Sequence, residues 1–243
     1  MSKRRTRTAP ALVAVLALAA SCGSGAAATD AASTSSGHPS PDKFTPRVDN
    51  RWFPLRPGTT FVSRGVRGGK RARDVVVVTG AKKTIDGVGC TVVKDRLYLD
   101  GRLHERTTDW YAQDRAGNVW YFGEATAELD ANGKVKSTEG SFRSGVDGAQ
   151  AGIYMPAHPR VGQTGRQEYY KGHAEDHFRV LSLHAHVRTP AASSRNALLT
   201  QETTPLEPGA IDHKLYVRGI GTAREEAIKG GTERLVLVSV RKH

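Results

Sequence analysis

The stretch CTVVKDRLYLDG, residues 90–101, decides the fold class. It begins with a β-branched, apolar run and ends at Asp100-Gly101, a dipeptide that favours a two-residue hairpin turn because both positions tolerate positive φ. Short runs of the same kind occur elsewhere in the chain. They are VVVVTG at 75–80, NVWYFGE at 118–124 and RLVLVSV at 234–240.

Turn-forming residues separate these runs at regular intervals, at 114–118, 130–133 and 229–231. No segment keeps an i, i+3, i+4, i+7 apolar stripe over three helical turns. The spacing therefore predicts a mainly β domain over residues 44–243, in which an antiparallel meander forms a curved sheet or a partly open barrel.

The composition is that of a globular protein. The chain has 243 residues, of which 38% are hydrophobic and 25% charged, so it can bury a sizeable core. This balance excludes collagen-like, wholly disordered and polytopic membrane proteins. The formal net charge is +12, which indicates anionic partners.

The N-terminus resembles a secretory signal peptide. Lys3, Arg4, Arg5 and Arg7 precede an apolar run from Ala9 to Ala20. This run is about a dozen residues long and falls short of the ~20 that a spanning helix needs. We therefore expect residues 1–21 to direct export.

Cys22 follows Ala19-Ala20-Ser21 and resembles the cysteine of a bacterial lipobox, although the position three before it is alanine where leucine is usual. This resemblance implies that Cys22 is diacylated and anchors the chain to the outside of the cell membrane. Cleavage after Ala19 by an ordinary signal peptidase, which would give a secreted protein, stays open as an alternative. Once Cys22 is acylated, only Cys90 remains, and its apolar neighbours predict a buried core residue.

Residues 22–43 are nearly all small residues, serine, threonine and proline, and we expect a flexible tether there. A single domain over 44–243 follows it.

Four blocks of this domain resemble an uncharacterised family of exported bacterial proteins and lipoproteins, best represented in actinobacteria. They are NRWFPLRPGTTFV (50–62), DWYAQDRAGNVWYFGE (109–124), STEGSFRSGVDGAQAGIYMPAHPRVGQTGRQEYYKG (137–172) and TPLEPGAIDHKLYVRGIG (204–221). The closing pattern, with Tyr216 before Gly219-Ile220-Gly221, is also similar to envelope proteins of the lipoprotein-carrier type with curved sheets. His173 and Arg218 depart from the family pattern.

Histidines gather in KGHAEDHFRVLSLHAHVR, residues 171–188. Imidazole and carboxylate ligands suit zinc or copper(II). Alternation along this segment favours a strand, on which His184 and His186 share a face. Further ligands would then have to come from His104, His158 or His213. The candidate metal ligands are His173, His177, His184 and His186.

Aromatic residues flank the turn at 114–118. Neighbours such as Trp120 and Tyr121 point to opposite faces of a strand, so they cannot all enter one core. Some of them could line a groove for an acyl chain, a sugar or an apolar peptide. The candidate ligand-binding residues are Trp110, Trp120, Tyr121, Tyr169 and Tyr170.

Carboxylates near these aromatics offer a second chemistry, because two of them across a groove could hydrolyse glycosidic bonds. These carboxylates are Asp109, Asp114, Glu124, Glu139 and Asp147. No nucleotide-binding loop, nucleophile elbow or metalloprotease motif accompanies them, and the sequence predicts no catalytic residues.

A basic, glycine-rich segment contains Arg64, Arg67, Lys70, Arg71 and Arg73, and we expect it to form a loop between two strands. With an export signal present, nucleic acid is excluded as its partner, and lipid head groups or anionic envelope polymers are expected.

The sequence thus predicts an exported, membrane-anchored lipoprotein that acts as a non-catalytic binding or carrier-like module in the cell envelope, with no cofactor. A histidine-based protein that binds zinc or copper and a hydrolase directed at the cell wall stay open as alternatives.

Overall fold

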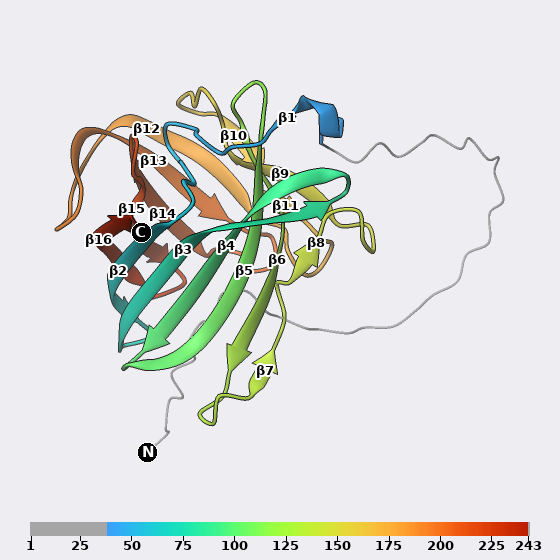
Figure 1. Ribbon diagram of the computed structural model, residues 1–243. Coiled ribbons are helices and arrows are strands. Elements are labelled where there is room, and N and C mark those ends of the chain that lie inside the picture. The colour runs from blue at the N-terminus through green and yellow to red at the C-terminus, as the bar shows by residue number, and fades with distance from the viewer. Residues whose placement is uncertain (1–37, 243) are drawn as a thin grey trace, which may run out of the picture.

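The computed structural model describes residues 38–242, and most of them belong to one antiparallel β-sheet (Figure 1). A 3-10 helix, η1 (Pro41–Lys43), precedes the sheet. The strands are β1 (Phe44–Thr45), β2 (Thr59–Arg67), β3 (Lys70–Ile85), β4 (Val88–Leu99), β5 (Arg102–Asp114), β6 (Val119–Leu129), β7 (Val135–Ser137), β8 (Phe142–Arg143), β9 (Gln150–Met155), β10 (Thr164–Arg166), β11 (Glu168–Tyr169), β12 (His177–Arg188), β13 (Ser193–Thr203), β14 (Ile211–Val217), β15 (Gly221–Lys229) and β16 (Arg234–Lys242).

The predicted mainly β fold, with an antiparallel meander that forms a partly open barrel, is confirmed. Within residues 38–242 no helix has the length and apolar character needed to cross a bilayer. The predicted signal peptide, Cys22 and most of the predicted tether lie outside the described residues.

The hairpin between β4 and β5 forms where the sequence predicts it. Asp100 and Gly101 have φ angles of 49° and 85°, and Leu99 pairs with Arg102 across the turn. Both φ values lie in the left-handed region that a tight hairpin requires, and glycine meets this requirement at low cost. Turns also occur at 115–118, 130–134 and 230–233, as predicted.

The prediction of a basic loop at 64–73 is wrong. β2 continues to Arg67 and β3 begins at Lys70, so only Gly68 and Gly69 make the turn. The glycine pair supplies the positive φ values of this hairpin, at 57° and 75°. The basic residues therefore stand on two paired strands, and Arg67 faces the interior of the sheet.

The sheet curves until its two ends, β10 and β11, come close together, and the barrel stays partly open. The strand order is β10-β12-β13-β14-β15-β16-β2-β3-β4-β5-β6-β9-β11, so the last strand, β16, pairs with the first long strand, β2. The two terminal strands of this order, β10 and β11, are separated in sequence only by Gln167. One short segment, 164–169, thus pairs with β12 by its first half and with β9 by its second half.

This short double pairing nearly closes the sheet into a barrel. A close approach of two backbones supports it, since an added Cβ at Gly152 on β9 would lie 2.3 Å from the Arg166 carbonyl oxygen. Arg166 also donates a hydrogen bond of 2.8 Å from its guanidinium to Gln150 Oε1. Only glycine permits the backbone to come this near at position 152.

The N-terminal segment covers part of the outer face of the sheet. Phe44 packs against Trp120 and Phe122, at ring-centroid distances of 6.3 and 5.3 Å. His38, which the sequence places in the tether, packs on Phe122 at 4.9 Å, and its Nε2 lies 2.7 Å from Asp86 Oδ2. Strands β4 to β6 are therefore buried on both faces at this end of the sheet, which explains their long apolar runs.

Gly152→Ala tests the closure at β9. We expect a loss of about 1–3 kcal/mol in the free energy of unfolding, because the new methyl group would force the 166–167 backbone away. Denaturant titration followed by circular dichroism measures it. Gly89→Ala on β4 is the control, since an added Cβ there meets no atom within 4 Å. Equal stability of the two variants would contradict the close approach.

Candidate binding cavity

A cavity of about 850 Å³ lies inside the curved sheet. Phe53 and Leu55, from the segment between β1 and β2, line its floor. The lining reaches the turn at Gly68-Gly69 and the turn at 230–233. In Figure 1 the segment that supplies the floor is the blue chain that runs from β1 across one end of the sheet to β2.

The floor is held by side-chain amides. Gln113 Oε1 on β5 accepts the backbone N–H groups of Asp49 and Asn50, at 2.9 and 2.7 Å. Asn50 Nδ2 donates to the carbonyls of Gly117 and Pro156, at 2.9 and 3.1 Å. Asn50 and Gln113 are buried. Their hydrogen bonds offset the free-energy cost of burying the two amides, and they also fix the segment to the sheet.

Trp52, which precedes Phe53 in this segment, is a core residue that does not line the cavity. Its side chain is 1% exposed, and the Arg218 guanidinium lies 4.8 Å from the centre of its ring. Arg218 is thus a packing partner of a core residue.

One wall of the cavity is aromatic. Tyr111 on β5 and Tyr121 on β6 stack with ring centroids 4.6 Å apart. Tyr154 on β9 meets Tyr111 edge-on at 5.2 Å, and Phe53 lies 4.6 Å from Tyr154. Such rings provide a large apolar surface with few rotatable bonds, which suits the binding of a small molecule.

The other walls are acidic, in contrast to the positive net charge of the whole chain. Twelve carboxylates but only four cationic side chains line the cavity. The carboxylates are Asp74, Asp95, Glu105, Asp109, Glu124, Glu168, Asp176, Glu202, Glu207, Asp212, Glu225 and Glu233, and the cations are Arg67, Lys214, Arg224 and Lys229.

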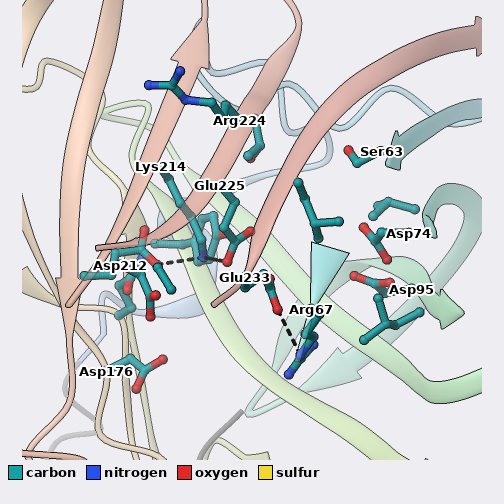
Figure 2. A pocket seen from close by; sticks show the side chains of 18 of the residues that line it. Ser63, Arg67, Asp74, Asp95, Asp176, Asp212, Lys214, Arg224, Glu225 and Glu233 are labelled. Carbon is teal, nitrogen blue, oxygen red and sulfur yellow. Dashed lines mark ion pairs between the residues drawn. The ribbon is translucent and has the colours of Figure 1, made fainter. Parts of the chain in front are cut away.

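The two cations that lie deepest are paired. Lys214 Nζ is 2.7 Å from Glu202 Oε2 and 3.6 Å from Glu225 Oε1. Burial lowers the pKa of Lys214, but these carboxylates outweigh burial and raise it well above its usual value. Arg67 Nε contacts Glu233 Oε2 at 2.8 Å. Figure 2 marks the ion pairs of Lys214 and Arg67, with side chains projecting from different strands toward one space.

The carboxylates that remain carry raised pKa values. Burial, followed by the charge of Asp95, raises the pKa of Asp109 to about 7, while the Tyr121 hydroxyl donates a 2.7 Å hydrogen bond to it. Burial and the neighbouring Asp95 likewise raise the pKa of Asp74 well above its usual value (Figure 2). Carboxyl groups at such positions take up a proton at a higher pH than surface acids do.

The aromatic residues singled out from the sequence divide between two faces. Tyr121 lines the cavity, whereas Trp110 and Trp120 lie in the cluster beneath the N-terminal segment. Tyr169 stacks under the Arg166 guanidinium at 4.4 Å, and Tyr170 stacks on His173 at 4.5 Å. Opposite orientation of adjacent residues along β6, as expected, places Trp120 outside and Tyr121 inside.

The predicted metal ligands lie on the surface. His173, His177, His184 and His186 are all exposed. His173 Nδ1 is 2.7 Å from Glu139, and His184 Nδ1 is 2.9 Å from Asn196 Oδ1. Among residues 38–242 no three histidines, cysteines or acids are grouped in a way that could hold a metal ion. Zinc or copper binding therefore stays a prediction.

Two of the five carboxylates singled out from the sequence face the cavity. Asp109 and Glu124 line it and are register partners across β5 and β6. Asp114 accepts from the Trp120 indole at 2.8 Å, which places it in a structural role outside the cavity. Hydrolysis by such a pair stays a prediction.

Cys90 is buried, as predicted. Burial raises the pKa of its thiol to about 12, because the apolar surroundings disfavour the thiolate. It is therefore an unreactive core residue.

Sequence reasoning missed most of the cavity. Tyr154, Glu168, Glu202, Lys214 and Glu233 stand on five different strands or turns and share no motif. The one available signal was the presence of single charged residues within otherwise apolar strands, such as Asp95 in CTVVKDRLYL.

No family model matches the chain, and comparison with curated proteins finds no match. Two solved structures are similar. A candidate exported protein with a YmcC-like fold from Bacteroides fragilis has 16% sequence identity and a TM-score of 0.45, and the match covers 79% of this chain and all of that one. A candidate lipoprotein from Parabacteroides distasonis has 11% identity and a TM-score of 0.44, with the same coverage of both chains.

Asp109→Asn tests the electrostatics of the cavity. The folded-state pKa of Asp109, about 7, lies above the unfolded value of about 4, so this carboxyl stabilises the fold below about pH 4 and its contribution is lost as the pH rises through 7. We expect the variant to match the parent near pH 4 and to be more stable near pH 8 by on the order of 2 kcal/mol.

Urea denaturation across this pH range measures the effect. Asp42→Asn, at an exposed position outside the cavity, is the control. If the free energies of unfolding of Asp109→Asn and the parent changed with pH in the same way, the raised pKa of Asp109 would be contradicted.

Proposed function

We propose that this protein is an exported lipoprotein, anchored through Cys22 to the outer face of the cell membrane, and that it binds a small molecule inside its curved sheet without transforming it. The observation that carries the proposal is the internal cavity of about 850 Å³, with an aromatic wall and a fixed floor. This volume lies within the range of ligand sites, about 300–1,000 Å³.

The residues that line the cavity suit a bound small molecule, which we call the guest. Leu97, Leu235 and Leu237 line it together with the aromatic rings, so an apolar body would displace water from a large surface. The polar groups are interspersed, as in sites that orient a ligand. A guest of mixed character, apolar with polar or charged ends, suits this lining best.

The attachment of the N-terminal segment supports an anchored arrangement. In this proposal residues 22–37 join the lipid on Cys22 to His38, and the His38 side chain is fixed on the sheet by Asp86 and by aromatic packing. The anchor would then hold the sheet close to the membrane, where amphiphilic molecules concentrate, which is what a carrier or a receptor for such molecules requires.

Cys22→Ala tests the anchor. We expect the parent chain in the membrane fraction of its producing cells and the variant in the soluble, exported fraction, because one acylated cysteine supplies the attachment. Cys90→Ala is the matched control, since that buried thiol cannot reach a membrane. Recovery of the parent chain from the medium would instead show plain secretion.

Ser63→Trp tests whether a small molecule binds in the cavity. Ser63 lines the cavity from β2, and an indole there would occupy part of the space. We expect native mass spectrometry of the exported parent chain to show a bound passenger that denaturation releases, and we expect Ser63→Trp to lose most of it. Val62→Trp is the control, because Val62 does not line the cavity.

A passenger that stays bound in Ser63→Trp would place binding elsewhere on the molecule. A parent chain that never carries a passenger and binds none of the probes described below would overturn the proposed function.

A further inference from the structure

Glu168 is a buried acidic residue of the cavity. It stands on β11, at the place where the sheet nearly closes, and its side chain lines the cavity. The residue is 7% exposed. No hydrogen bond or ion pair from the described chain, residues 38–242, reaches its carboxylate. A buried carboxylate without a partner is costly, so its presence calls for an explanation.

The neighbours of Glu168 make its surroundings more acidic. Burial, followed by the charge of Asp176, raises the pKa of Glu168 well above its usual value. Lys214 acts in the opposite direction, and Asp109 and Glu202 add to the increase. Asp176 Oδ1 is itself buried without a hydrogen-bond partner in the described part of the chain. The titratable groups that face Glu168 are Asp109, Glu124, Asp176, Glu202 and Lys214.

The cations that line the cavity do not balance these charges. Lys214 is shared between Glu202 and Glu225, and Arg67 is paired with Glu233. Arg224 contacts Glu226 at 3.6 Å, and Lys229 is exposed at the end of β15. Glu168, Glu124 and Asp176 are therefore left facing a shared space in which a positive charge would be strongly favoured.

The aromatic wall lies beside this acidic region. Tyr121 donates to Asp109, whose register partner is Glu124, and Tyr121 also stacks on Tyr111. Carboxylates next to aromatic rings form the combination that recognises substituted ammonium groups, because the carboxylate attracts the charge and the rings accept the carbon substituents. A bare metal ion would leave most of an 850 Å³ cavity unfilled.

We propose that the guest of this protein is an organic cation, an ammonium group on an apolar body, and that Glu168 and Glu124 receive its positive charge while Tyr111, Tyr121 and Tyr154 contact its apolar part. This inference rests on the proposed function and names the chemical class of the guest. An ammonium group paired with Glu168 would favour the ionised form of this carboxyl, so binding would lower its pKa and release protons to solvent.

Three probes of similar size and different charge test it: 1-naphthylmethylammonium, 1-naphthylmethanol and 1-naphthoate. The purified full chain is held in phosphatidylglycerol nanodiscs, whose lipids carry no ammonium group, and empty nanodiscs serve as the blank. Isothermal titration calorimetry measures each affinity, and titrations in phosphate and Tris buffers at one pH reveal proton release by the difference in apparent enthalpy. Magnesium chloride and zinc chloride are titrated separately.

We expect the ammonium probe to bind about tenfold or more tightly than the alcohol, the naphthoate to bind weakest, and a proton to be released only with the ammonium probe. Glu168→Gln keeps the shape of the side chain and should abolish both the preference and the proton release. Asp42→Asn, which removes a carboxylate outside the cavity, should change neither. Glu124→Gln serves as the second variant if Glu168→Gln does not fold, as judged by circular dichroism.

The outcomes separate the two proposals. Equal affinities for the ammonium and alcohol probes, or an unchanged preference in both glutamine variants, would overturn the cationic guest and leave a cavity that binds small molecules. Tight binding of magnesium or zinc with no binding of the ammonium probe would also overturn it. Binding of no probe, with no passenger on the exported chain, would overturn the proposed function as well.

Discussion

The hydrogen bonds of Gln113 hold the arrangement on which the rest of the structure depends. They fix Asp49 and Asn50 across one end of the sheet, and the residues on either side of this point then cover two different surfaces. Phe44 lies on the outer face with Trp120 and Phe122, whereas Trp52 and Phe53 enter the inner cluster. A curved sheet has two apolar faces to bury, and here one segment contributes to both.

Closure of the sheet determines the character of its interior. Because β16 pairs with β2 and segment 164–169 joins β9 to β12, side chains from strands far apart in sequence face a common space. Aromatic rings fill one part of it, and an excess of carboxylates occupies the rest. A folded protein normally avoids buried like charges, since each raises the cost of ionising the next. Their accumulation around Glu168 is therefore best understood as a binding feature, and it gives the proposed carrier a preference for positive charge.

The outside and the inside of the molecule have opposite electrostatic character. The chain carries a formal net charge of +12, to which the predicted signal peptide contributes Lys3, Arg4, Arg5 and Arg7. The cavity is lined by three times as many acids as bases. A basic exterior suits an anionic membrane or envelope surface, and an acidic interior suits a cation held away from that surface. Both properties agree with the proposed exported carrier anchored close to a lipid bilayer.

The sequence by itself determined the local structure. β-branched runs with turn residues between them specified an antiparallel meander, and Asp100-Gly101 specified its clearest hairpin, because these preferences act over a few neighbouring residues. Alternation along β6 also required Trp120 and Tyr121 to face opposite sides. Only the tertiary structure decided which side became the cavity, since that choice depends on β16 meeting β2 and on a segment near the N-terminus covering the outer face. Glu168, Glu202 and Lys214 come together through the same long-range pairings, which no local pattern encodes.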